Sequence, residues 1–88
     1  MSEAIYCYDT ASVRFAVYPQ DKLRIVAEIE ENPLRDLFGA TGGGDTLLEA
    51  YLSNCEVINA LALEKYRGAP GRPVLLATAD FVLYQQAA

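Results

Sequence analysis

The chain has 88 residues, of which 52% are hydrophobic and 22% charged, and its seven basic and twelve acidic residues give a formal net charge of −5. This length corresponds to one domain, residues 1–88, and the apolar content is typical of a globular protein, which excludes a disordered chain. The negative charge, with no run of basic residues, argues against attraction to nucleic acid or to an anionic membrane.

The start of the chain, Met1–Ala4, has neither the basic residues nor the apolar stretch of a secretion signal. No segment approaches the ~20 apolar residues that a membrane-spanning helix needs. We therefore expect a cytoplasmic protein. Two cysteines and no histidine are present, so zinc-type spacings and the Cys-x-x-Cys redox motif are absent. In a reducing compartment Cys7 and Cys55 should be free thiols.

The first half of the chain carries the alternating pattern of a β-hairpin. Apolar residues occupy every second position from Val13 to Val17 and again from Leu23 to Ile29. Pro19–Lys22 lies between them and has the composition of a turn, because proline fixes the φ of the second turn position and aspartate bonds nearby backbone. A short strand at Ile5–Tyr8 is expected to precede the hairpin.

A short helix is predicted over Pro33–Phe38. Asn32 is a suitable N-cap, proline is favoured at the first helical position, and Gly39 follows the last apolar residue.

A long helix is predicted over Asp45–Arg67, which contains neither glycine nor proline. Beyond it, Val74–Tyr84 is apolar on both faces, which predicts a strand that is covered on both sides. Together these elements predict an α+β fold, in which an antiparallel sheet of three to four strands carries the long helix and the short helix on one face, in the order β-β-α-α-β.

One side of the long helix suggests an interface. At ~100° per residue, a broad arc should face the sheet, and Ala50, Val57 and Leu61 form an apolar shoulder beside it. The shoulder widens the apolar sector to about 240°, whereas packing against one layer needs little more than 100°. Either a second copy or partner protein covers this shoulder, or the short helix or the N-terminal segment does. The residues expected to face the sheet are Leu47, Leu48, Tyr51, Leu52, Cys55, Ile58, Ala62, Leu63 and Tyr66.

The loop before the long helix resembles a phosphate-binding loop but lacks its lysine. Asp45 stands in the lysine position after Gly42, Gly43 and Gly44, and its negative charge would oppose a phosphate, so nucleotide binding is not expected. The three glycines at a helix start could still form a backbone site for a small anion. Alternatively, the loop is a connection in which Asp45 or Thr46 caps the helix.

No catalytic, cofactor-binding or metal-binding constellation is evident. Glu28, Glu30, Glu31 and Asp36 cluster near the second strand of the hairpin, but they lack the spacing of a calcium loop and are expected to form a solvated acidic edge. Basic residues near the end of the long helix complement its macrodipole. Without histidine, no acid, base and nucleophile are brought together by spacing. We therefore expect neither an enzyme nor a bound cofactor or metal. The basic residues are Lys65, Arg67 and Arg72.

Several short motifs extend over nearly the whole chain. The most specific are Lys65-Tyr66 at the end of the long helix and Ala79-Asp80-Phe81 near the end of the chain. With them the chain resembles a family of short bacterial proteins catalogued as a domain of unknown function. The resemblance implies a small bacterial cytoplasmic α+β domain and brings no known activity. The other motifs are Tyr8-Asp9, Val13-Arg14-Phe15, Phe38-Gly39-Ala40, Leu47-Leu48, Ala50-Tyr51, Asn54, Ile58, Ala62 and Val74-Leu75-Leu76.

The sequence therefore favours a module that self-associates, most simply as a homodimer, or binds a protein partner through Val57, Leu61 and Ala50. The alternative is a domain that binds a small ligand or anion at Gly42–Gly44. The first hypothesis predicts an exposed apolar patch and a mass above that of one subunit. The second predicts that a ligand stabilises the fold while the protein stays a monomer.

Overall fold

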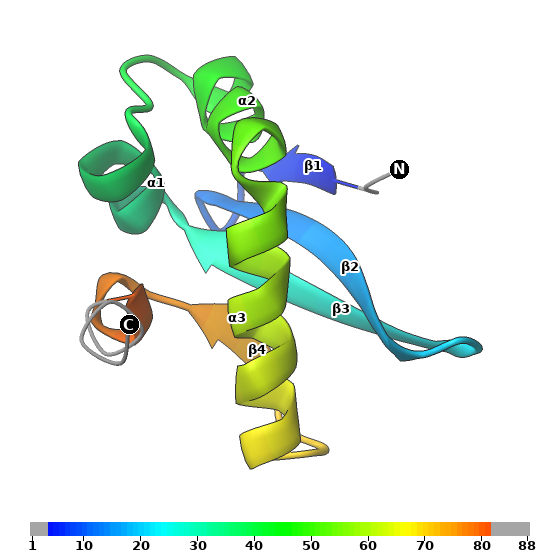
Figure 1. The fold of residues 1–88 in the computed structure, drawn as a ribbon. Helices are drawn as coiled ribbons and strands as arrows, with labels where there is room; N and C mark the ends of the chain where they lie inside the picture. The colour runs from blue at the N-terminus through cyan, green and yellow to red at the C-terminus, as the bar shows by residue number, and fades with distance from the viewer. Residues whose placement is uncertain (1–3, 82–88) are drawn as a thin grey trace.

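The computed structural model describes residues 4–81, in which helices lie on one side of a four-stranded sheet (Figure 1). The predicted α+β class is confirmed, but the order of elements is β-β-β-α-α-α-β-α, because the short strand expected before the hairpin forms, the long helix is divided and a helical turn follows the last strand. The elements are β1 (Ala4–Cys7), β2 (Ser12–Gln20), β3 (Leu23–Glu30), α1 (Glu31–Phe38), α2 (Gly44–Ser53), α3 (Cys55–Gly68), β4 (Val74–Leu76) and a final helical turn at residues 78–81.

The sheet is mixed, so the prediction of a purely antiparallel sheet is wrong. The strand order is β1-β2-β3-β4, in which the first three strands are antiparallel neighbours. β4 runs parallel to β3, with Ala27 beside Val74 and Ile29 beside Leu76. Three helices connect β3 to β4, and a connection of that length can return the chain to the same end of the sheet, which a tight turn cannot do.

The hairpin between β2 and β3 turns later than predicted. Val17 pairs with Ile25 and Gln20 with Leu23, so β2 carries one more residue than β3 over this interval. Pro19 lies in this bulge rather than in the turn. The position suits proline, which has no N–H to give to the ladder and is found in sheets at edges and bulges. The turn itself consists of residues 21 and 22.

Helix α1 begins earlier than predicted and ends as predicted. It starts at Glu31, so Asn32 is not its N-cap, and a salt bridge from Arg35 to Glu31 stabilises the added first turn. At the other end Gly39 adopts a left-handed conformation with φ of 80° and donates its N–H to the carbonyl of Leu34. Glycine is favoured there because it reaches positive φ without a steric penalty.

The predicted long helix is two helices that meet at Asn54. The Asn54 side chain donates from Nδ2 to the carbonyl of Ala50 at 2.9 Å, and its backbone N–H donates to Tyr51 at 3.0 Å. Asparagine side chains compete with the backbone for such bonds. The backbone of Asn54, with φ −127° and ψ 21°, leaves the helical region and separates α2 from α3.

The predicted strand Val74–Tyr84 is wrong beyond Leu76, since residues 78–81 form a helical turn; residues 82–84 lie outside the described part of the chain. Asp80 explains the turn. It is the third residue of the turn, and its Oδ2 accepts the N–H of Ala77 at 2.8 Å, as in half of a capping box.

Asp80 also connects this turn to α3. Lys65 Nζ lies 3.2 and 3.1 Å from the two carboxylate oxygens of Asp80 and donates to the carbonyl of Leu75 at 2.6 Å. Lys65 therefore joins α3 to β4 and to the turn after it, and with Arg67 it also lies in the last turn of α3, where positive charge was predicted. The two most specific sequence motifs of the chain meet at this point.

The core lies between the helices and the inward face of the sheet. Tyr51 is fully buried, and its ring centroid is 4.7 Å from that of Phe15 on β2. Its hydroxyl donates to Asn59 Oδ1 at 2.7 Å, which satisfies the amide oxygen of a residue on α3. The other large buried apolar side chains of the core are Val13, Val17, Ile29, Leu34, Leu47, Ile58, Leu61, Val74, Leu76 and Phe81.

Phe81 should be one of the main sources of stability. It is 2% exposed and packs edge-on against Phe38, with ring centroids 5.4 Å apart. Phe81→Ala should lower the free energy of unfolding by about 3 to 5 kcal/mol through lost burial and the cavity left behind. Urea denaturation measures the change, and Val57→Ala, at a half-exposed position, is the control. Equal midpoints for Phe81→Ala and the parent would contradict the packing described.

Candidate functional site

The side of the sheet opposite the helices is a candidate interaction surface, which we call the open face. Because side chains alternate along a strand, the residues between the buried positions of β2 and β3 point away from the helices. Ile5, Val26 and Leu75 are 59%, 44% and 40% exposed, and no described element covers them. The open face consists of Ile5, Cys7, Ser12, Arg14, Ala16, Tyr18, Arg24, Val26, Glu28, Glu30 and Leu75, of which Ser12 and Ala16 are buried.

An ion pair lies at the centre of the open face. Arg14 Nε and Nη2 donate to Glu28 Oε1 at 3.1 and 2.8 Å. The hydrogen bond to Glu28, with the negative charge of that carboxylate, raises the pKa of Arg14 above its ordinary value. Strand pairing places Ile5 next to Arg14 on one side and Leu75 next to Glu28 on the other. The row across the sheet is therefore apolar at both ends and charged in the middle.

This ion pair contributes little to folding because both side chains are partly in water, at 46% and 24% exposure. Its effect is to hold two long side chains in one orientation. Beside it, a hollow of ≈ 430 Å³ lies between β1 and β3, with Ile5 and Val26 in its lining. The open face thus combines a fixed charged centre with an apolar recess.

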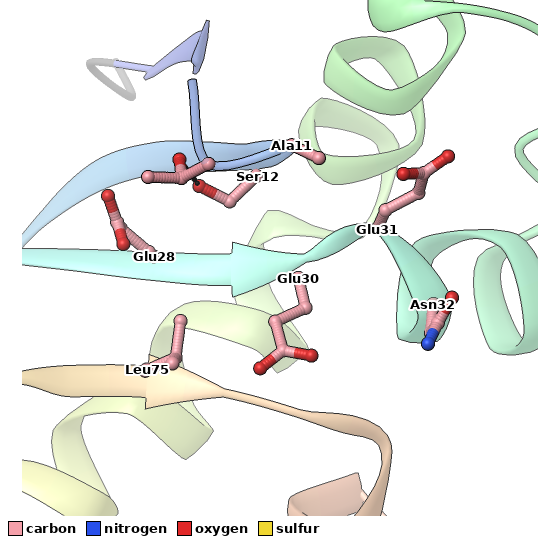
Figure 2. Close-up of a pocket in the computed structure, with 8 residues that line it drawn as sticks. Ala11, Ser12, Glu28, Glu30, Glu31, Asn32 and Leu75 are labelled. Carbon is pink, nitrogen blue, oxygen red and sulfur yellow. Dashed lines mark hydrogen bonds between the residues drawn. The ribbon is translucent and has the colours of Figure 1, made fainter. Parts of the chain in front are cut away.

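A second hollow, of ≈ 350 Å³, lies at the end of β3 (Figure 2). Figure 2 shows Glu30 extending from β3 toward Leu75, Glu28 on the side of β3 that faces Ser12, and Glu31 at the start of α1. Asp36, the fourth acid of the predicted acidic edge, does not line it. Glu28 and Glu31 are each bonded to an arginine, and residues 4–81 contain no group of three side chains arranged to hold a metal ion. The remaining lining residues are Thr10, Ala11, Ser12 and Asn32.

The predicted helix shoulder is not a single surface. Ala50 and Leu61 are each 7% exposed and belong to the core, so the expectation that they form an exposed interface is wrong. Ala50 lies next to the chain after α1, and α3 packs Leu61 toward the sheet. Val57 alone of the three is exposed, at 41%.

The prediction for the shoulder failed because the buried side of the two helices is centred nearer Leu47 than expected. At ~100° per residue, the buried residues of α2 and α3 share one arc of about 120° centred on Leu47, and this arc includes the predicted shoulder positions Ala50 and Leu61. Leu52, expected to face the sheet, is exposed instead and lies near Val57 at the junction. An asparagine within an otherwise unbroken helical pattern was the signal that could have revealed the break.

The glycine loop is closed by its own hydrogen bonds. Gly42 donates its N–H to Thr46 Oγ1 at 2.9 Å, and the same hydroxyl donates to the carbonyl of Gly43 at 2.8 Å. Gly43 is the N-cap of α2, without a side-chain cap, so neither Asp45 nor Thr46 has the predicted capping position. A backbone anion nest needs residues with left-handed backbone, which have positive φ, next to right-handed ones. None of Gly42, Gly43 and Gly44 has positive φ, so the loop does not form such a nest.

Packing explains the glycine at position 44 without a ligand. A Cβ added there would lie 2.6 Å from the Tyr6 ring, which rests on the start of α2. Both cysteines, Cys7 and Cys55, are free, as predicted. Among the helices of residues 4–81, none combines the length and the apolar character needed to cross a bilayer.

Comparisons of the chain with protein-family models, with curated proteins and with solved structures found no match. The resemblance to a bacterial family of unknown function therefore stays a prediction. The physical properties of the described surfaces are the remaining guide to function.

The burial of Leu61 changes the expected effect of a mutation there, because a residue on an exposed shoulder could be replaced without unfolding the domain. Leu61→Glu should unfold the domain, because removing a buried leucine side chain costs about 2 to 5 kcal/mol and the new carboxylate would be buried without a partner. Val57→Glu, four residues earlier on the same helix, should retain the fold because Val57 is half exposed. Circular dichroism melting curves distinguish the two variants. A folded Leu61→Glu protein would show that α3 does not pack as described.

Proposed function

We propose that this chain is a protein-binding module that works through the open face of its sheet, either with a second copy of itself or with another protein. Its main support is the exposure of Ile5, Val26 and Leu75, which lie on three strands of a sheet face that no described element covers. The proposal keeps the function predicted from the sequence and moves the surface from the helix shoulder to the sheet.

The pattern of the outward positions supports this surface. Antiparallel sheets that face water on one side normally alternate apolar residues inward with polar residues outward. Here Ile5 and Val26 interrupt that alternation on β1 and β3, and Leu75 does so on β4. Ile5 and Val26 line one hollow of this face, and apolar side chains gathered around a recess mark protein–protein contacts more often than isolated surface leucines do.

The charged groups on the open face fit a binding role. Arg14 and Glu28 are held in one orientation before any partner arrives, which reduces the entropy lost when they are ordered in a complex. Arginine is also enriched in protein interfaces because its planar group bonds and stacks at once. The proposal requires no catalytic residue, cofactor or metal ion, and it retains the expectation of a cytoplasmic protein.

Binding of a small ligand or anion at Gly42–Gly44 has less support. The N–H of Gly42 is already donated to Thr46, and the three glycines lack the positive φ values of a nest. A phosphate held at 100 times its dissociation constant would stabilise the fold by about 2.7 kcal/mol and raise the melting temperature by roughly 10 °C or more. We expect no such shift with inorganic phosphate or with magnesium-ATP.

A substitution on the open face tests the proposed function directly. Ile5→Glu should abolish both self-association and the capture of proteins from a bacterial lysate, because a carboxylate replaces the most exposed apolar side chain of the face. Val57→Glu is the matched control, an equal change at an exposed apolar position away from the sheet. Light scattering and quantitative mass spectrometry of captured proteins provide the readouts. Equal association by Ile5→Glu and the parent would refute the proposal.

A further inference from the structure

The charges of the open face differ from those of the chain as a whole. The chain carries a formal net charge of −5, so two copies repel each other on average. The open face holds two arginines, Arg14 and Arg24, and two glutamates, Glu28 and Glu30, and is therefore neutral. It contains two of the seven basic residues of the chain. Because the open face is neutral, its own charges do not repel the same face of a second copy.

The order of these charges along β3 is self-complementary. Arg24, Val26 and Glu28 lie two residues apart and point to the same side of the sheet. At ~3.4 Å per residue, Arg24 and Glu28 are each roughly 7 Å from Val26, in opposite directions. Consider a two-fold axis that lies between the two stacked sheets and runs perpendicular to β3 at Val26. It brings Arg24 of each copy opposite Glu28 of the other.

We propose that the partner at the open face is a second copy of this chain, stacked sheet to sheet about a two-fold axis at Val26. This inference rests on the proposed function and specifies its partner. Val26 of one copy contacts Val26 of the other, and two Arg24–Glu28 contacts flank that centre. Such contacts are identical in pairs, as a two-fold interface requires. Stacked sheets cross at about 30°, so the contacts nearest the axis are kept best.

The size of the face predicts the strength of the dimer. The face is roughly 27 Å long along β3 and about 14 Å wide across four strands, which is on the order of 400 Å² in projection. Stable interfaces bury about 800 Å² per partner, and weak, transient ones bury less. The dimer should therefore form with a dissociation constant in the micromolar range and must be measured over a concentration series.

Analytical ultracentrifugation of the full chain from about 1 µM to 1 mM tests the inference. The parent should pass from monomer to dimer over this range. Val26→Glu should remain monomeric, because two carboxylates would meet at the axis, and Val57→Glu should associate as the parent does. Circular dichroism confirms that each variant is folded.

A charge-exchange pair tests the register of the dimer. Arg24→Glu alone and Glu28→Arg alone should each weaken the dimer at least tenfold, since like charges then meet twice across the axis. An equimolar mixture of the two variants should restore association, because both contacts in the mixed dimer pair opposite charges. Glu28→Arg also removes the bond to Arg14, but an exposed pair contributes little to folding.

Contrary outcomes separate this inference from the proposed function. If the parent stays monomeric at 1 mM, the partner is not a second copy of the chain. If Ile5→Glu in that case loses a protein that the parent captures, the proposed function still stands. Dissociation by Val57→Glu but not by Val26→Glu would overturn both. A Val26→Glu monomer together with no recovery in the charge-exchange mixture would overturn the two-fold register.

Discussion

Tyr51 joins the helical layer to the sheet. Its ring packs on Phe15 of β2, its backbone belongs to α2, and its hydroxyl bonds Asn59 of α3. Burial of an aromatic side chain contributes about 1.5 to 3 kcal/mol, and the hydrogen bond adds on the order of 1 kcal/mol. Since the bond passes from one side of the break at Asn54 to the other, it also fixes how α2 and α3 lie relative to each other.

The position of this layer determines what remains exposed. Helices α2 and α3 cover the face of the sheet that contains Phe15 and Ile29 (Figure 1). The helices of residues 4–81 form a single layer, and one layer covers one face of a sheet. The opposite face therefore stays in contact with water, although Ile5, Val26 and Leu75 give it apolar character. The proposed function follows from this arrangement.

Local patterns in the sequence were reliable, and relations between distant segments were not. Alternation located β2 and β3 and their buried sides, and Gly39 marked the end of α1, because each depends on neighbouring residues. The direction of β4 depends on the path of three intervening helices. No local pattern encodes that path.

The candidate surface was missed for a related reason. Helical periodicity gave Ala50 and Leu61 an exposed shoulder because the apolar sector of the helices is wider than the side they bury, and Leu52 was assigned to the buried side in their place. The open face was not identified because Leu75 reaches it only when β4 pairs beside Glu28. Conversely, Phe81 lies in the core, although it arrives there on a helical turn and not on the predicted strand.

The central claim is that the open face, and not the helical layer, is the binding surface. Methyl-resolved NMR spectra recorded over a dilution series test it without any mutation. We predict that the methyl signals of Ile5, Val26 and Leu75 shift with protein concentration, while those of the buried Ile29 and Leu47 stay constant. Concentration-dependent shifts at Leu52 and Val57, with constant signals from the three open-face residues, would contradict the account.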